Sequence, residues 1–311
     1  MISKEKFTEE AKKFVSMEEK YKFERVKKQM RILMLLAVLL FALCFIIPVV
    51  ISVVLMFDFV DLQIVLAAYV SPLACFTIAI CLLNKRKNVY VEWKSGYLNE
   101  IFKILLGDYR YNYSAKQKLK KHYLYESGFM NVKSLGTYDI DDLLEISFTA
   151  NNSKETELKF SLCDVIASVR ENDGRAKKVF DGVFGFVEFP EKFNFKVSIN
   201  SHITGVEKLK LEDVNFNKEF DIRTDNPVET FYIITPKIMQ DLQKFQEKTA
   251  KKLKFSIVDK YLYIGLEKAN FFEFDMNTLT IEQFERIYDE INLIITLVNE
   301  IRNNRTLTVK K

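Results

Sequence analysis

The chain has 311 residues, a formal net charge of +4, and only 9 Gly and 4 Cys. So few glycines leave no Gly-rich phosphate loop and no dinucleotide-binding fingerprint. Three of the four cysteines lie in long apolar stretches and only Cys163 lies elsewhere, which excludes a disulfide framework and a zinc-binding cysteine pattern.

Two long stretches without a charged side chain, residues 32–57 and 62–84, dominate the first third of the chain. Each exceeds the roughly 20 residues that an α-helix needs to cross the hydrocarbon core of a bilayer. A helix satisfies its own backbone hydrogen bonds, as lipid requires. The connection between them is short and carries Asp58 and Asp61. The sequence therefore predicts a transmembrane hairpin with spans 31–57 and 62–84.

Basic residues flank both ends of this predicted hairpin and are absent from its connection. They are Lys20, Lys22, Arg25, Lys27, Lys28 and Arg31 before it, and Lys85, Arg86, Lys87 and Lys94 after it. Short flanks rich in Lys and Arg stay on the cytoplasmic side. We therefore expect a multi-pass protein of the bacterial inner (plasma) membrane, with both termini in the cytoplasm.

The same basic residues suit the anionic headgroups of a lipid bilayer, where each is worth about 1 kcal/mol. From residue 135 onward the chain has 25 Lys and Arg against 30 Asp and Glu. Because the positive charge does not extend into this distal part, we expect lipid contact and no nucleic-acid binding. A protein partner is also expected, but the sequence does not identify it.

The segments next to the spans are predicted to be helical. Residues 1–30 form an amphipathic cytoplasmic helix with Phe7, Ala11 and Phe14 on its apolar face. This face suits either the membrane interface or the protein's own cytoplasmic domain, and both alternatives remain open. Residues 85–130 are predicted to be basic juxtamembrane helices, with one apolar stripe ending at Gly107 and a second, Lys-rich helix capped by Ser114.

Residues 131–311 read as an α+β cytoplasmic domain. Predicted strands, rich in Val, Ile and Phe, cover 143–149, 157–169, 179–189, 193–199, 228–234, 253–258 and 261–267. Short connections favour antiparallel pairing. A helix begins at Thr235 and Pro236 and runs to about Thr249. The last helix begins after Thr280, and its apolar stripe is too wide for a coiled-coil seam. The predicted fold is thus membrane-anchored α+β, with a two-helix hairpin, a mainly antiparallel sheet and a C-terminal packing helix.

The few nucleophilic or basic side chains of this domain have simple structural interpretations. A catalytic pair of Cys163 and His202 would need an activated thiolate beside a base. In a strand-rich stretch, Cys163 is better explained as a small core residue. His122 is expected on the surface.

Acidic residues form two small groups. Glu212 and Asp213 suit a metal or a basic partner, but a surface turn explains them better. Asp139, Asp141 and Asp142 do not match a calcium-binding loop and are interpreted as the polar start of a strand. We therefore assign no catalytic, cofactor-binding or metal-binding residue from the sequence and expect no cofactor.

Three local patterns resemble a known family. They are residues 180–185 (FDGVFG), residues 211–213 (LED) with Phe216 and Phe220, and residues 232–236 (YIITP) with Met239 and Leu242. Their order behind a membrane hairpin resembles the uncharacterised bacterial family called domain of unknown function 3137, over about residues 140–300. The resemblance implies a bacterial inner-membrane protein with a cytoplasmic domain. It implies no activity and no catalytic residues.

A complete anchor and a folded domain without a catalytic constellation favour a membrane-anchored module that binds a protein or a small ligand. One alternative is an enzyme of unrecognised type that acts on lipids or envelope precursors. Another is an accessory subunit of a transport assembly, although neither span contains the ionisable residues typical of ion pathways. A pocket with several buried polar groups would favour the enzyme, and an exposed apolar patch on the domain would favour the binding module.

Overall fold

The computed structural model describes the chain except residues 1, 16, 56–61, 108, 118, 131–136, 149–157, 171–173, 250–251, 269–271, 274–279 and 310–311. For residues 17–19, 21, 54–55, 62–69, 148, 248–249 and 305–309, the backbone alone is described. The chain forms two compact units. One is built from residues 1–11, 98–275 and 280–311, and the other from residues 12–97.

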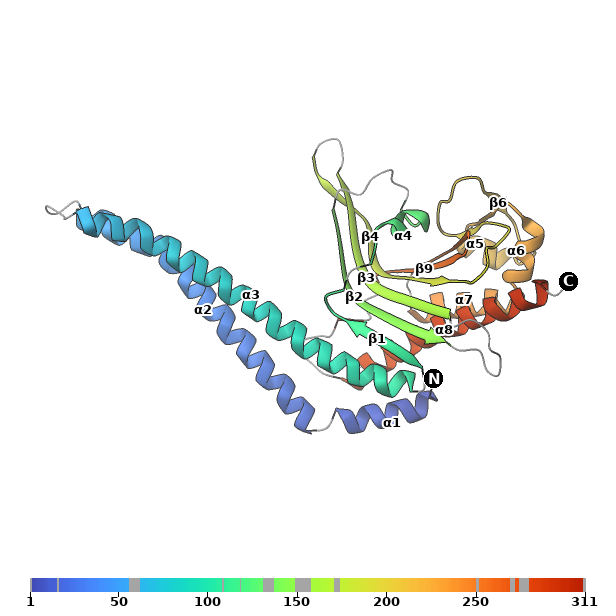
Figure 1. Ribbon diagram of the computed structural model, residues 1–311, viewed down its shortest axis with the longest axis horizontal. Coiled ribbons are helices and arrows are strands. Elements are labelled where there is room, and N and C mark those ends of the chain that lie inside the picture. The colour runs from blue at the N-terminus through green and yellow to red at the C-terminus, as the bar shows by residue number, and fades with distance from the viewer. Residues whose placement is uncertain are drawn as a thin grey trace. The chain divides into compact units, whose positions relative to one another are not determined.

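The unit of residues 12–97 consists of two long helices that run in opposite directions (Figure 1). They are α2 (Met17–Leu55) and α3 (Leu62–Leu106), the last turns of which belong to the other unit. Phe23 contacts Trp93 with ring centroids 5.2 Å apart, and Phe41 contacts Phe76 at 5.3 Å. The Sγ of Cys44 donates a hydrogen bond to the carbonyl oxygen of Pro72 at 3.3 Å. These contacts join the two helices along their length.

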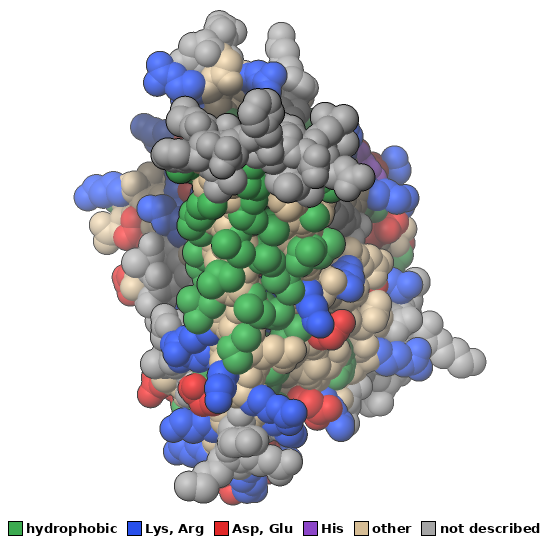
Figure 2. All heavy atoms as spheres, turned by 90° about the vertical axis from the view of Figure 1, so that its left-hand side faces the viewer, with side chains coloured by type: hydrophobic (Ala, Val, Ile, Leu, Met, Phe, Trp, Pro, Cys, Tyr) green, Lys and Arg blue, Asp and Glu red, His purple; other side chains and the backbone are tan. Residues whose placement is uncertain are grey.

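Among the described residues, one helix is long and apolar enough to cross a membrane. It covers Lys22–Val53 in α2, and only 6% of its most apolar stretch is buried. Figure 2 shows hydrophobic side chains gathered over this part of the molecule. The helix α3 continues past Asn84 without a break and ends before Gly107, whose φ of +54° suits a residue without a Cβ.

The other unit is α+β and contains a large antiparallel sheet. Its strands follow the order β1-β2-β3-β4-β9-β8-β5-β7-β6. Their bounds are β1 Arg110–Ser114, β2 Thr137–Phe148, β3 Leu158–Arg170, β4 Ala176–Glu188, β5 Val197–Ile199, β6 Glu207–Leu209, β7 Ile222–Thr224, β8 Leu253–Val258 and β9 Tyr261–Glu267. All the strand pairs described are antiparallel, as the short connections predict.

The helices of this unit are α1 (Lys4–Phe14), α4 (His122–Glu126), α5 (Val214–Glu219), α6 (Pro227–Ile233), α7 (Pro236–Thr249) and α8 (Ile281–Val309). The core between strands and α4 includes Phe180, Phe184 and Tyr263. Gly182 on β4 has a structural reason: a Cβ there would lie 2.1 Å from the carbonyl oxygen of Leu266 on the neighbouring strand β9. The absence of a Cβ at Gly182 therefore permits the close approach of the β4 and β9 backbones.

The C-terminal helix α8 packs inside the chain, as its wide stripe predicts. Phe284, Ile291 and Val298 are fully buried, together with the residues between them on the same face. The alternative of a narrow coiled-coil seam does not describe this helix. The helix α7 and the hairpin of β8 and β9 also match the prediction closely.

The N-terminal prediction is partly wrong, because the helix ends at Phe14 and a new helix begins at Met17. The apolar face of α1 lies against α8. Phe7 is fully buried with its ring 5.1 Å from that of Tyr288, and Lys4 pairs with Asp289 at 2.8 Å. Of the two alternatives for this face, packing on the protein's own domain therefore holds for α1.

Two further predictions of secondary structure are wrong. The predicted strand at residues 228–234 is absent, and α6 (Pro227–Ile233) stands in its place, because the Asn226 side chain accepts a hydrogen bond from the Glu229 amide and Pro227 starts the helix. The Lys-rich helix after Ser114 is reduced to α4, and Arg110–Ser114 is a strand of the sheet. The hydroxyl of Ser114 accepts from the amides of Lys116 and Gln117 in a turn.

Candidate functional site

The structure separates the side chains that the sequence pairs for nucleophilic catalysis. Cys163 is buried in the sheet core, and its Sγ donates to the carbonyl oxygen of Phe184 at 3.6 Å. Burial raises the pKa of this thiol well above its ordinary value, which keeps it protonated. His202 and His122 are both exposed. The interpretation of Cys163 as a core residue is confirmed.

The acidic pair at residues 212–213 belongs to a helix start. The Asp213 carboxylate accepts hydrogen bonds from the amides of Asn215 (2.8 Å) and Phe216 (3.0 Å) and so caps α5. This positions Phe216 and Phe220, whose stacked rings lie 4.4 Å apart in the core. Asp213 therefore has a structural role, but as the cap of a helix and not in the surface turn that the sequence predicts.

Asp142 lies at an irregularity of β2 that changes the direction of its side chain. Asp141 pairs with Asp164 and Leu144 pairs with Leu162, so two residues of β2 face the single residue Cys163 of β3. This is a β-bulge, and Asp142 adopts a φ of +60°, which Asp tolerates better than most residues. Without the bulge, Asp142 and Asp141 would point to opposite faces of the sheet.

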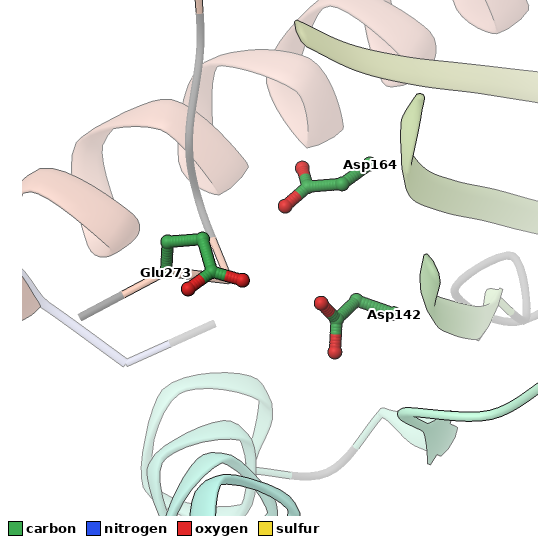
Figure 3. Close-up of side chains that lie close together, drawn as sticks. All are labelled: Asp142, Asp164 and Glu273. Atoms are coloured by element: carbon green, nitrogen blue, oxygen red, sulfur yellow. The ribbon is translucent and has the colours of Figure 1, made fainter. Parts of the chain in front are cut away.

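Three carboxylates from separate segments converge beside this bulge. Asp142 on β2, Asp164 on β3 and Glu273 before α8 each offer an oxygen, and these oxygens lie within 4.8 Å of one another. Figure 3 shows the three side chains pointing toward one another. Asp142 is 2% exposed, and the other two are half-buried. We refer to these three residues as the carboxylate cluster.

Tyr113 on β1 holds one member of the cluster. Its hydroxyl donates to Oδ1 of Asp142 at 2.5 Å, and its ring stacks on Phe272 at 6.0 Å and contacts Phe102 at 5.3 Å. Burial, followed by the charge of Asp142, raises the pKa of the Tyr113 phenol far above its ordinary value. Tyr113 therefore remains a hydrogen-bond donor throughout the neutral range.

A pocket of about 470 Å³ opens over the cluster, and its lining is strongly acidic. It is lined by Asp139, Asp141, Asp142, Asp164, Asp181 and Glu273, with Lys268, Val165, Ile166 and Gly182. Asp141 and Asp164 are direct cross-strand partners, an arrangement in which like charges destabilise a sheet. Asp181 is compensated by Lys178, with Nζ and Oδ2 2.7 Å apart.

Carboxylate oxygens are the ligands that Ca²⁺, Mg²⁺ and Mn²⁺ prefer, so the carboxylate cluster is the candidate metal centre of the described chain. The same arrangement attracts an organic cation into the pocket. No metal-binding residue is assigned from the sequence, which therefore does not identify this candidate. Asp139, Asp141 and Asp142 are close together in the sequence, whereas Asp164 and Glu273 lie in other segments. The only signal in the sequence was an Asp inside an otherwise apolar strand stretch, at position 164.

We expect Tyr113→Phe to lower the free energy of unfolding by about 1–3 kcal/mol, because a buried carboxylate loses its hydroxyl donor while the ring packing remains. Urea denaturation of the full-length protein in mild detergent measures this change. Tyr111→Phe is the matched control, since the Tyr111 hydroxyl donates to the Asn99 carbonyl at 2.9 Å from a less buried position. Equal losses in both variants would contradict a specific role of Tyr113.

Comparison with known proteins gives one match. Residues 178–303 match the model of a family described as a protein of unknown function (DUF3137). No curated protein matches the chain, and no solved structure does. The match begins later than the predicted residue 140, so Glu273 lies inside it while Asp142 and Asp164 lie before it. From β4 to α8, the α+β unit of this chain resembles the DUF3137 family.

Proposed function

We propose that this protein is an integral protein of the inner membrane, in which α2 and α3 form a two-helix transmembrane hairpin. The surface of α2 carries the proposal. Leu35 is 69% exposed, Phe45 70% and Val49 63%, on a stretch of which 6% is buried. Leaving a side chain of this size in water instead of an apolar environment costs roughly 1.5–3 kcal/mol of free energy. An apolar solvent is therefore the simplest explanation of this surface.

The second helix supports a hairpin rather than a single span. On α3, Val70, Leu73 and Ile78 are also exposed, and the contacts from Phe41 to Phe76 and from Cys44 to Pro72 place this stretch beside the apolar part of α2. Two helices paired in this way both face the same solvent. The basic flanks of both favour a cytoplasmic position of the two termini.

The soluble unit, in this proposal, binds a partner at the cytoplasmic surface. Its support is a patch of apolar side chains on one face of α6: Val228 is 64% exposed, Phe231 49% and Tyr232 48%. We refer to these three residues as the α6 patch. Of the residues that line the acidic pocket, Asp142 is the single buried acid. An exposed apolar patch together with a pocket that has one buried acid favours a binding module over an enzyme.

Membrane insertion can be tested with single tryptophans, because Trp93 is the only tryptophan of the chain. In a Trp93→Phe background, we expect Phe45→Trp to be strongly quenched by lipids brominated in the middle of their acyl chains. Phe231→Trp, on α6, is the control and should not be quenched. Similar quenching at both positions, or none at position 45, would refute the hairpin.

The orientation can be tested with a membrane-impermeant maleimide in cells whose outer membrane is permeable. We expect Val214→Cys, which is 65% exposed on α5, to react only after the inner membrane is opened. Asp58→Cys, in the predicted loop, should react before it is opened. The native Cys163 is buried and contributes little background. Early labelling of position 214 would place the soluble unit outside the cytoplasm.

The binding role can be tested by quantitative mass spectrometry of proteins that co-purify with the full-length chain. We expect Val228→Ser with Phe231→Ser to reduce recovery of a specific partner at least about tenfold, since apolar anchors dominate interface energies. A matched variant with Lys210→Gln and Lys218→Gln changes exposed residues outside the α6 patch and should retain that partner. Equal recovery with both variants argues against the patch.

A further inference from the structure

The two long helices meet along a regular seam. On α2, the less exposed positions include Met30, Leu33, Ala37, Phe41 and Cys44, at spacings of three or four residues. On α3, they are Pro72, Cys75, Ala79, Leu82 and Arg86. This spacing is that of an antiparallel coiled-coil seam. Ala37 and Ala79 are both fully buried at its middle, and their small side chains allow close approach of the helices.

In the register of this seam, the basic ends of the two apolar stretches lie at the same height along the helix pair. Phe23 contacts Trp93, and Phe41 contacts Phe76, so moving toward the C-terminus of α2 corresponds to moving toward the N-terminus of α3. Arg31 follows Phe23 by as many residues as Lys85 precedes Trp93. Arg31 is also the last charged residue before the apolar stretch of α2, and Lys85 is the first one after that of α3.

These cations have no charge partner in the described part of the chain. Arg31 and Lys85 are exposed and form no ion pair there, whereas Lys27, one turn away, pairs with Glu24 at 3.9 Å. Arg86 lies in the seam, and its Nε is shielded from water without a hydrogen-bond acceptor among the described residues. A shielded donor without an acceptor is costly, and an acceptor from outside the chain would remove that cost.

The surroundings of the three cations are apolar on one side only. Ile32, which follows Arg31 directly, is 48% exposed, and Leu83, two residues before Lys85, is 39% exposed. A ligand that satisfies both sides has an anionic head and a hydrocarbon tail. An arginine guanidinium binds phosphate oxygens through two parallel hydrogen bonds, and lysine adds a point charge.

We propose that Arg31, Lys85 and Arg86 form a binding site for the phosphate of an anionic phospholipid at the cytoplasmic surface of the membrane. This proposal rests on the proposed transmembrane hairpin and adds the class of lipid that the hairpin binds. Its three positive charges prefer a headgroup with net negative charge, because the choline of a zwitterionic lipid already neutralises its own phosphate. The lipid phosphate supplies the acceptor that Arg86 lacks.

The test uses the full-length protein in nanodiscs that contain phosphatidylcholine and a minor fraction of phosphatidylglycerol. Native mass spectrometry measures the ratio of the two lipids that remain bound to the protein. We expect phosphatidylglycerol to be enriched at least about fivefold over its share in the nanodisc. In the variant Arg31→Gln, Lys85→Gln and Arg86→Gln, this enrichment should fall to about the share in the nanodisc, since each such residue contributes a factor of a few.

A variant with Lys210→Gln, Lys218→Gln and Lys244→Gln is the matched control, because it removes the same charge from exposed positions of the soluble unit. It should keep the preference. The double variant Arg31→Gln and Lys85→Gln spares the seam residue and should lose part of it. The proposal is overturned if the triple variant and the control behave alike, or if inorganic phosphate removes the preference of the wild type as completely as the triple substitution does.

Quenching of the tryptophan at position 45 separates this proposal from the hairpin. Quenching without a lipid preference refutes the phosphate site and leaves the hairpin standing. If the tryptophan at position 45 is not quenched, both proposals fail together.

Discussion

Water is a poor solvent for the surface of α2, and much of this protein follows from that fact. Large apolar side chains between Ile32 and Val53 point away from the chain, on a helix whose backbone groups are satisfied internally. Packing against α3 covers one narrow stripe of this surface and leaves the rest. In the proposed hairpin, a bilayer would remove this mismatch, because its hydrocarbon core accepts apolar side chains and requires the helical backbone that α2 and α3 already have.

The seam between the two helices also determines where charge is placed. Its register depends on contacts among Phe23, Trp93, Phe41 and Phe76, none of which is charged. That register nevertheless aligns the basic residues at the ends of the two apolar stretches. The proposed lipid site is therefore a consequence of apolar packing, with Arg86 inside the seam as the link between packing and charge.

In the α+β unit, the acidic pocket depends on one backbone irregularity. The bulge at Asp142 turns a carboxylate toward Asp164, and Tyr113 on the edge strand β1 stabilises it with a hydroxyl donor. Like charges on neighbouring strands oppose folding, and natural proteins usually accept such costs where a ligand or partner is involved. The α6 patch lies on a separate helix and exposes apolar side chains to water, which costs free energy. In the proposed function, a protein partner covers this patch.

The sequence by itself determined the two apolar stretches, the antiparallel α+β unit, the bounds of α7, the start of α8, and the hairpin of β8 and β9, because periodicity and capping are local signals. It was wrong at residues 228–234, where a run of β-favouring side chains concealed the cap at Asn226, and after Ser114, where a turn replaces a helix. Only the tertiary structure decided that α1 packs on α8, that Cys163 is buried while His202 is exposed, and that Asp142, Asp164 and Glu273 meet. Those facts depend on strand register, a bulge and contacts between residues distant in sequence, which no local pattern encodes.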